Sequence, residues 1–219
     1  MSAIAAAPPP VRRDPANHIL LRNVSWRLYR SFVEEVGGGN VRITYSKGMM
    51  EIMSPPPQHE RRKKLVAQMV EMLTFELGIS RGSFGSTTSA DEALDQGLEP
   101  DECYYIANEA AVRGLDRIDL TVHPPPDLAI EVDISYRAIK RESLYAAMKV
   151  PEVWRDDGTH LECLVLGPSG VYAASAYSKA FPHLRVADLE QFLDMAPRTG
   201  ENAMLRAFRD WIRSRPGGG

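Results

Sequence analysis

The chain has 219 residues and a formal net charge of −3 at pH 7, whereas dedicated nucleic-acid binders usually have a basic excess, so any nucleic-acid contact must depend on a local patch. Cys103 and Cys163 are the two cysteines, and neither belongs to a CxxC or Cys/His cluster, which disfavours a structural zinc site and a disulfide framework. The 44% hydrophobic content suits a globular core, and no apolar run reaches the ~18 residues that a membrane span needs, so we expect a cytoplasmic protein without a membrane anchor.

The two ends of the chain differ in composition from the rest. Residues 1–17 are rich in alanine and proline but lack the charged and apolar regions of a secretory signal, and they predict a disordered or loosely attached tail. Residues 216–219 are proline followed by three glycines and predict a second tail. The stretch between them, 18–215, is expected to form a single domain.

The first elements predicted are a helix and a hairpin. Residues 25–36 form the helix, with Ser25 as its cap and glycines at 37–39 as its end. Residues 41–46 and 49–53 alternate between apolar and polar positions, and Lys47-Gly48 separates them, which predicts a β-hairpin.

A long helix is predicted over residues 58–77, where apolar positions recur at helical spacing. Four consecutive cations, at positions 61–64, lie near its amino end, where they oppose the helix dipole. Two interpretations stay open for them: a stripe that faces phosphates, or a solvated helix face.

The remaining elements alternate between strands and helices. Residues 83–89 are consistent with a strand followed by a loop. Further strands are predicted at 103–106, 128–134, 150–155, 161–166 and 170–174, with a turn at 97–102 and helices at 108–113, 137–149, 188–194 and 201–213. This order predicts an α/β fold in which helices flank a mixed central sheet, preceded by the amino-terminal helix and hairpin.

Residues 128–134 attract attention because two acids interrupt an otherwise apolar strand. Glu131 and Asp133 are two positions apart and therefore leave the same face of the strand. A carboxylate that is buried loses its hydration shell. This loss costs roughly several kcal/mol unless a cation or hydrogen bonds replace the water. The pair suggests a bound cation or a nearby lysine or arginine; alternatively, one acid ends the strand in solvent.

Asp101 opens the strand before this one, so its carboxylate can meet that of Glu131 if the strands are neighbours. Magnesium commonly takes one or two carboxylates and keeps several waters, and manganese could replace it. Lys140 and Arg141 follow within reach and could stabilise developing charge. His59 and Glu60, which open the long helix, could supply a further ligand or a proton acceptor.

Several short strings, spread over about residues 26–213, together resemble the Uma-two family of bacterial restriction-endonuclease-like proteins, grouped with the PD-(D/E)XK nucleases. They are residues 51–55, His59-Glu60, 97–106, 119–121, 125–134, 145–147 and 150–155. The resemblance implies a restriction-endonuclease-like fold, a divalent metal, and hydrolysis of nucleic acid, with DNA favoured. Pro100-Asp101 matches the PD element and Glu131 the (D/E) position, while Glu60 and His59 match residues of the first core helix.

The chain departs from the superfamily pattern at one position. The lysine expected two residues after Glu131 is Asp133, and Arg141 or Lys140 on the following helix takes its place in the resemblance. An arginine stabilises charge but is a poor general base. We therefore keep a catalytically inactive module that binds nucleic acid or a protein partner as the alternative. A homodimer built on the closing helices, with Phe208 and Trp211, is a third interpretation, although such residues belong more often to a core.

Overall fold

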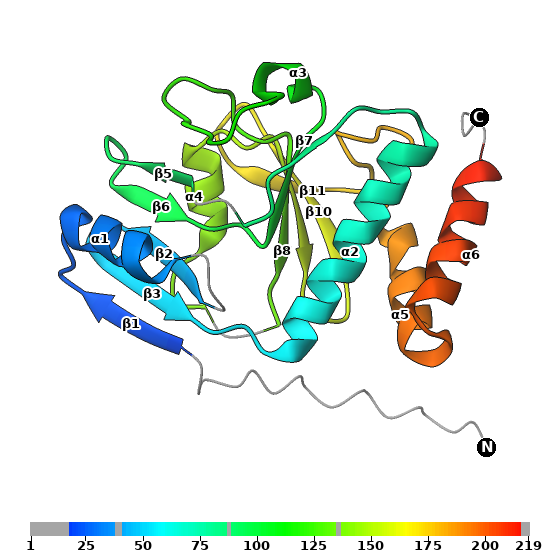
Figure 1. The fold of residues 1–219 in the computed structure, drawn as a ribbon, viewed down its shortest axis with the longest axis horizontal. Helices are drawn as coiled ribbons and strands as arrows, with labels where there is room; N and C mark the ends of the chain where they lie inside the picture. Colours follow the sequence, from blue (N-terminus) through cyan, green and yellow to red (C-terminus); the bar gives the residue numbers. More distant parts are fainter. Residues whose placement is uncertain (1–17, 38–40, 87–88, 135–136, 216–219) are drawn as a thin grey trace.

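The computed structural model describes residues 18–37, 41–86, 89–134 and 137–215, so both predicted tails, 1–17 and 216–219, lie outside the described residues. These residues form two sheets flanked by helices (Figure 1). The arrangement confirms the predicted mixed α/β architecture. No helix in the described ranges is long and apolar enough to cross a membrane.

The first sheet is antiparallel and contains the predicted hairpin. The Ser25 hydroxyl caps its helix by accepting a hydrogen bond from Leu28 N at 3.2 Å, and the turn residues Lys47 and Gly48 have φ angles of 47° and 83°, as a tight hairpin requires. The elements, in the order of the sheet, are β1 (His18–Arg22), β3 (Met49–Met53), β2 (Arg42–Ser46), β6 (Gln96–Leu98) and β5 (Ser89–Asp91), with α1 (Trp26–Val36) packed on them.

Three strands of this sheet differ from the prediction. Strands β1 and β5 were not predicted, and β6 occupies a stretch predicted as a turn. Gly97 explains the error at β6, because a Cβ atom at this position would lie 2.1 Å from the Tyr29 hydroxyl oxygen. The glycine is therefore needed for close packing inside a strand rather than for a turn.

The second sheet carries the acids of interest at one end. Its strands, in order, are β11 (Tyr172–Ser175), β10 (Leu161–Leu166), β9 (Glu152–Asp156), β8 (Leu128–Val132), β7 (Glu102–Tyr105) and β4 (Gly82–Ser83). Strands β8 and β9 run parallel and are joined through α4 (Arg141–Ala147), while the other neighbours are antiparallel. This is the predicted mixed sheet, and the predicted hairpin at 161–174 is confirmed.

Helices cover both faces of this sheet (Figure 1). On one face α2 (Pro57–Glu76), α5 (Glu190–Thr199) and α6 (Glu201–Arg213) pack on Leu128, Ile130 and Trp154, with Val186–Leu189 as a short 3-10 turn before α5. Helix α4 lies on the other face, against Ala129 and Val153. The short helix α3 (Glu109–Val112) confirms the prediction for that stretch.

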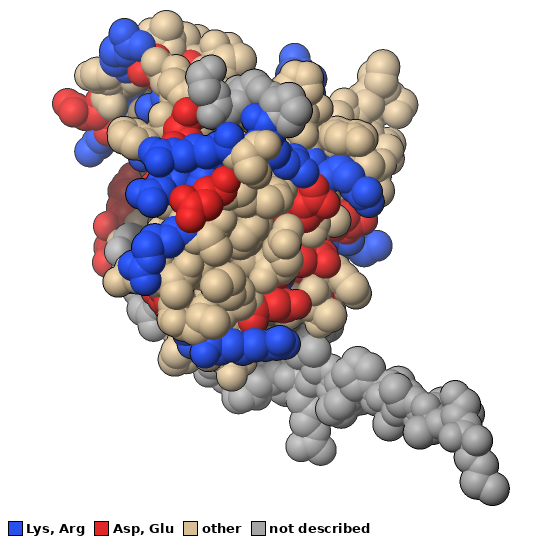
Figure 2. All heavy atoms as spheres, turned by 90° about the vertical axis from the view of Figure 1, so that its right-hand side faces the viewer, with Lys and Arg blue, Asp and Glu red and all other residues tan. Residues whose placement is uncertain are grey.

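The closing helices contribute to the core. Phe208 is fully buried, and Trp211 stacks on it with ring centroids 5.6 Å apart. Figure 2 shows the side of the molecule where these helices lie, with positive and negative side chains intermingled around an uncharged centre. The two aromatic residues therefore act as core residues.

One boundary matters for the site. Helix α4 begins at Arg141, so the prediction of a helix from residue 137 was wrong. Strand β8 ends at Val132, two residues earlier than predicted. Arg137 therefore belongs to the connection between β8 and α4, and this position lets its side chain reach the end of the sheet.

Candidate active site

Asp101 and Glu131 come together at the end of the second sheet. The antiparallel register pairs Glu102 with Ile130, so one further step along both strands sets Asp101 opposite Glu131. Residues directly opposite each other project from the same face of a sheet. Both side chains are buried, with exposed fractions of 0% for Asp101 and 4% for Glu131.

Arg137 faces both acids. Its Nη2 atom lies 3.7 Å from Asp101 Oδ2 and 3.5 Å from Glu131 Oε2, so the two carboxylates flank one point. Arg141 lies closer to the second acid, with 3.0 Å between its Nη1 atom and Glu131 Oε2, and it also donates to the backbone oxygen of Glu99. The structure thus brings the predicted Arg141 to Glu131 and adds Arg137.

Glu131 is held from the other side by Tyr145, whose hydroxyl donates to Oε1. Tyr145 lies one turn of α4 beyond Arg141, so both side chains leave the same side of the helix. Burial raises the pKa of Glu131 to about 7, although the charge of Arg141 partly offsets this effect and that of Asp101 adds to it.

His59 and the backbone hold Asp101. His59 lies in the first turn of α2, fully buried, with its Nε2 atom 3.0 Å from Asp101 Oδ2. The same oxygen accepts a hydrogen bond of 2.8 Å from Val132 N. Burial alone would raise the pKa of Asp101, but the hydrogen bond to His59, together with the charges of His59, Arg137 and Arg141, lowers this pKa.

Glu60 and Lys140, two other residues predicted for the site, do not contact the acids. Glu60 instead lies 3.1 Å from Lys63 and 3.5 Å from Arg42. Lys140 is exposed, and within the described ranges it makes no ion pair.

The four cations at positions 61–64 form the stripe predicted near the amino end of α2. Three of them contact acids of the chain itself: Arg61 with Glu201, Arg62 with Asp156, and Lys63 with Glu60.

The donor atoms present fit a divalent cation of the magnesium type. Asp101 Oδ1 and Glu131 Oε2 are buried and have no hydrogen-bond partner. Within the described residues, no group of three His, Cys, Asp or Glu is arranged to hold a metal ion. Two carboxylate oxygens would leave the remaining positions to water or to substrate oxygens, as magnesium commonly accepts.

Sequence reasoning missed three residues of this cluster. Arg137 was assigned to a helix, although its position six residues after Glu131 was a usable signal. Tyr145 belongs to the string 145–147 of the family resemblance. Its spacing of four residues from Arg141 places both side chains on the same side of a helix, which was the available signal. Arg42, with Nε 3.8 Å from Asp101 Oδ1, comes from the other sheet, and no local pattern indicated it.

A cavity of about 610 Å³ opens beside Glu131, and we call it the α4 cavity. Both charged and apolar side chains line it. Its lining comprises Glu131, Asp133, Arg137, Ile139, Lys140, Arg141, Glu142, Ser143, Tyr145, Ala146, Val153, Arg155, Leu164, Gly170, Val171 and Tyr172.

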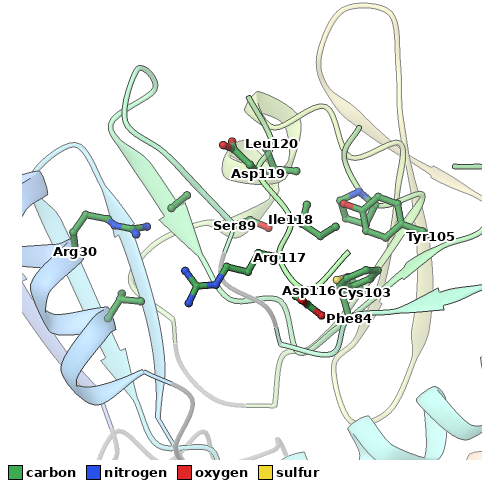
Figure 3. Close-up of a pocket in the computed structure, with 13 residues that line it drawn as sticks. Arg30, Phe84, Ser89, Cys103, Tyr105, Asp116, Arg117, Ile118, Asp119 and Leu120 are labelled. Carbon is green, nitrogen blue, oxygen red and sulfur yellow. The ribbon is translucent and has the colours of Figure 1, made fainter. Parts of the chain in front are cut away.

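Another cavity, of about 630 Å³, lies between α1 and residues 116–120 (Figure 3). Arg30 and Arg117 reach toward it from opposite sides, and Asp116 and Asp119 also line it. Cys103 contributes to its lining, and burial raises the pKa of this thiol to about 12, as expected for a core residue rather than a nucleophile. Neither acid lines this cavity, whereas Glu131, Arg137 and Arg141 line the α4 cavity, so the candidate site is at the α4 cavity.

The comparison with protein families agrees with this geometry. Residues 32–197 match the model of the Uma2 family, described as "Putative restriction endonuclease". The match covers well over half of the chain, and the chain therefore belongs to the Uma2 family of restriction-endonuclease-like proteins. A search among curated proteins found no match.

Proposed function

We propose that the chain is a divalent-metal-dependent endonuclease that hydrolyses phosphodiester bonds of nucleic acid. The observation that carries this proposal is the position of Arg137 Nη2 between Asp101 and Glu131 at a buried end of the sheet. Membership of the Uma2 family supports a nuclease-like function. Magnesium or manganese is the cofactor that two buried carboxylate oxygens without a hydrogen-bond partner suit best.

Each residue of the cluster has a role in this proposal. Asp101 Oδ1 and Glu131 Oε2 would hold the metal ion, which when bound polarises a phosphoryl oxygen and lowers the pKa of a bound water. Arg137 and Arg141 would stabilise the negative charge that develops on the phosphate. His59 and Tyr145 are positioning residues, because each holds one of the two acids by a hydrogen bond.

The test compares cleavage of plasmid and oligonucleotide substrates by the full chain and its variants. We expect cleavage with magnesium or manganese, its loss with EDTA, and at least a 100-fold decrease in Asp101→Asn and Glu131→Gln. The control is Asp210→Asn, which changes an exposed acid of α6 and should remain within twofold. Cleavage that survives EDTA, or survives both substitutions in folded protein, would overturn the proposal.

A second function is favoured by one observation. Arg137 and Arg141 already supply positive charge to the two acids, and Asp133 replaces the superfamily lysine. In this case the domain would bind nucleic acid without cleaving it. Binding that weakens steeply with salt and no turnover with either metal would favour this function over the nuclease.

A further inference from the structure

The α4 cavity is lined by two chemically different kinds of side chain. Arg137 and Arg141 lie next to Glu131, whereas Ile139, Leu164 and Tyr172 belong to one hydrophobic cluster. The Tyr172 hydroxyl donates to the backbone oxygen of Val150, which fixes the position of its ring. An anionic group therefore suits the two arginines, and a flat apolar group suits the hydrophobic side chains.

A nucleotide combines these two groups in one molecule. Its phosphate is recognised by arginine, and its base stacks on aromatic side chains or packs against apolar ones. The volume of about 610 Å³ falls in the usual range of small-molecule sites. A cavity of this volume has no room for a duplex, so only a single nucleotide taken out of the stack could enter.

We infer that the α4 cavity binds one unpaired nucleotide of the nucleic acid, a statement that rests on the proposed function. The base lies against Tyr172, Ile139 and Leu164, and its phosphate lies at Arg137 and Arg141, next to Glu131. A paired base would first have to leave its duplex, at a cost of about a few kcal/mol. The protein therefore prefers single-stranded or unpaired nucleotides to continuous duplex.

Binding can be measured independently of cleavage. An oligonucleotide that carries 2-aminopurine is titrated with the full chain in calcium, both as a single strand and within a continuous duplex. We expect the single strand to bind at least tenfold more tightly, with a change in 2-aminopurine emission that the duplex does not show.

The matched variants are Val171→Trp and Val122→Trp. Val171 lines the cavity and is 65% exposed, while Val122 is 76% exposed and does not line it. An indole at position 171 should fill the cavity mouth and weaken single-strand binding at least tenfold, whereas the change at 122 should remain within twofold. Because both valines are exposed, the folding of both variants should be unaffected.

The outcomes separate this inference from the proposed function. Single-strand preference that Val171→Trp abolishes supports the cavity as the binding site, even where no cleavage is detected and the nuclease proposal fails. Equal binding of single strand and duplex, unchanged by Val171→Trp, overturns the inference even where metal-dependent cleavage is observed.

Discussion

The Arg141 guanidinium lies 3.0 Å from the Glu131 carboxylate, and both side chains are almost completely buried. Removal of one partner of such a pair leaves an uncompensated charge in the protein interior, which costs about 3–5 kcal/mol. We therefore expect Arg141→Met to lower the free energy of unfolding by about that amount, as measured by urea denaturation.

Arg137→Met is the comparison, because Arg137 belongs to a connection rather than to a helix and its closest acidic oxygen is 3.5 Å away. It should destabilise the protein less than Arg141→Met while abolishing cleavage. We thus distinguish Arg141, whose ion pair is needed for folding, from Arg137, which faces the site. Equal losses of stability in the two variants would contradict this distinction.

Tyr145 offers a second test, because its hydroxyl donates to Glu131 Oε1. Tyr145→Phe leaves this oxygen without that donor, at a cost of about 1–3 kcal/mol for an unsatisfied buried group. We expect that loss in urea denaturation and at least a tenfold decrease in cleavage, since the carboxylate loses its fixed orientation. Tyr105→Phe is the control, because the Tyr105 hydroxyl donates to Pro124 O at 3.0 Å, away from the site. It should lower stability without lowering cleavage.

The central strand and its acids were predictable because their signal is local. A short apolar run between prolines indicates a buried strand, and Glu131 stands out within it. The start of α4 was not predictable in this way. Residues 137–140 include good helix formers, yet Ala138 N donates to Glu51 Oε1, on the other sheet, at 2.6 Å. A tertiary contact overrides helix propensity there, and Arg137 becomes available to the site as a result.

Glu152 carries a prediction about stability rather than activity. It is fully buried and accepts four hydrogen bonds, from Trp154 Nε1 at 2.6 Å, Cys163 Sγ at 3.3 Å, Lys179 N at 2.8 Å and Ala180 N at 2.7 Å. In Glu152→Gln the side-chain NH2 group is itself a donor and would lie against the N–H groups that now donate to the carboxylate. We therefore expect the free energy of unfolding to fall by about 2–4 kcal/mol.

Glu162→Gln is the matched control for Glu152→Gln. Glu162 lies on the neighbouring strand and pairs with Arg155 at 2.7 Å, but both side chains are over a third exposed. Such surface pairs contribute about 0–1 kcal/mol. A similar loss of stability in both variants would show that the buried hydrogen bonds of Glu152 do not explain its effect.

The two cysteines give a measurement that needs no substitution. Both are buried free thiols, and burial raises the pKa of each, to about 12 for Cys103. Because the thiolate is the reactive form, neither should react with a thiol reagent such as DTNB at pH 8 in the folded protein. Both should react rapidly after denaturation. Rapid reaction of one thiol without denaturant would place that cysteine at an accessible position.

Arg185 provides a test of the path that a bound strand takes beyond the α4 cavity. A neighbouring cavity of about 670 Å³ shares Asp133 and Arg155 with the α4 cavity and is also lined by Arg185. Arg185 is exposed and has no ion-pair partner in the part of the chain that the structure describes. If it contacts a phosphate, Arg185→Glu should weaken binding of every sequence alike.

The measurement is the salt dependence of oligonucleotide binding, in which loss of one phosphate contact lowers the slope by about 1. Arg206→Glu is the control, because Arg206 is an equally exposed cation on α6, across the sheet from the α4 cavity. It should leave both affinity and slope within error of the unmodified chain. An unchanged slope for Arg185→Glu would show that the strand leaves the site in another direction, since the change reverses a charge where the backbone is expected to pass.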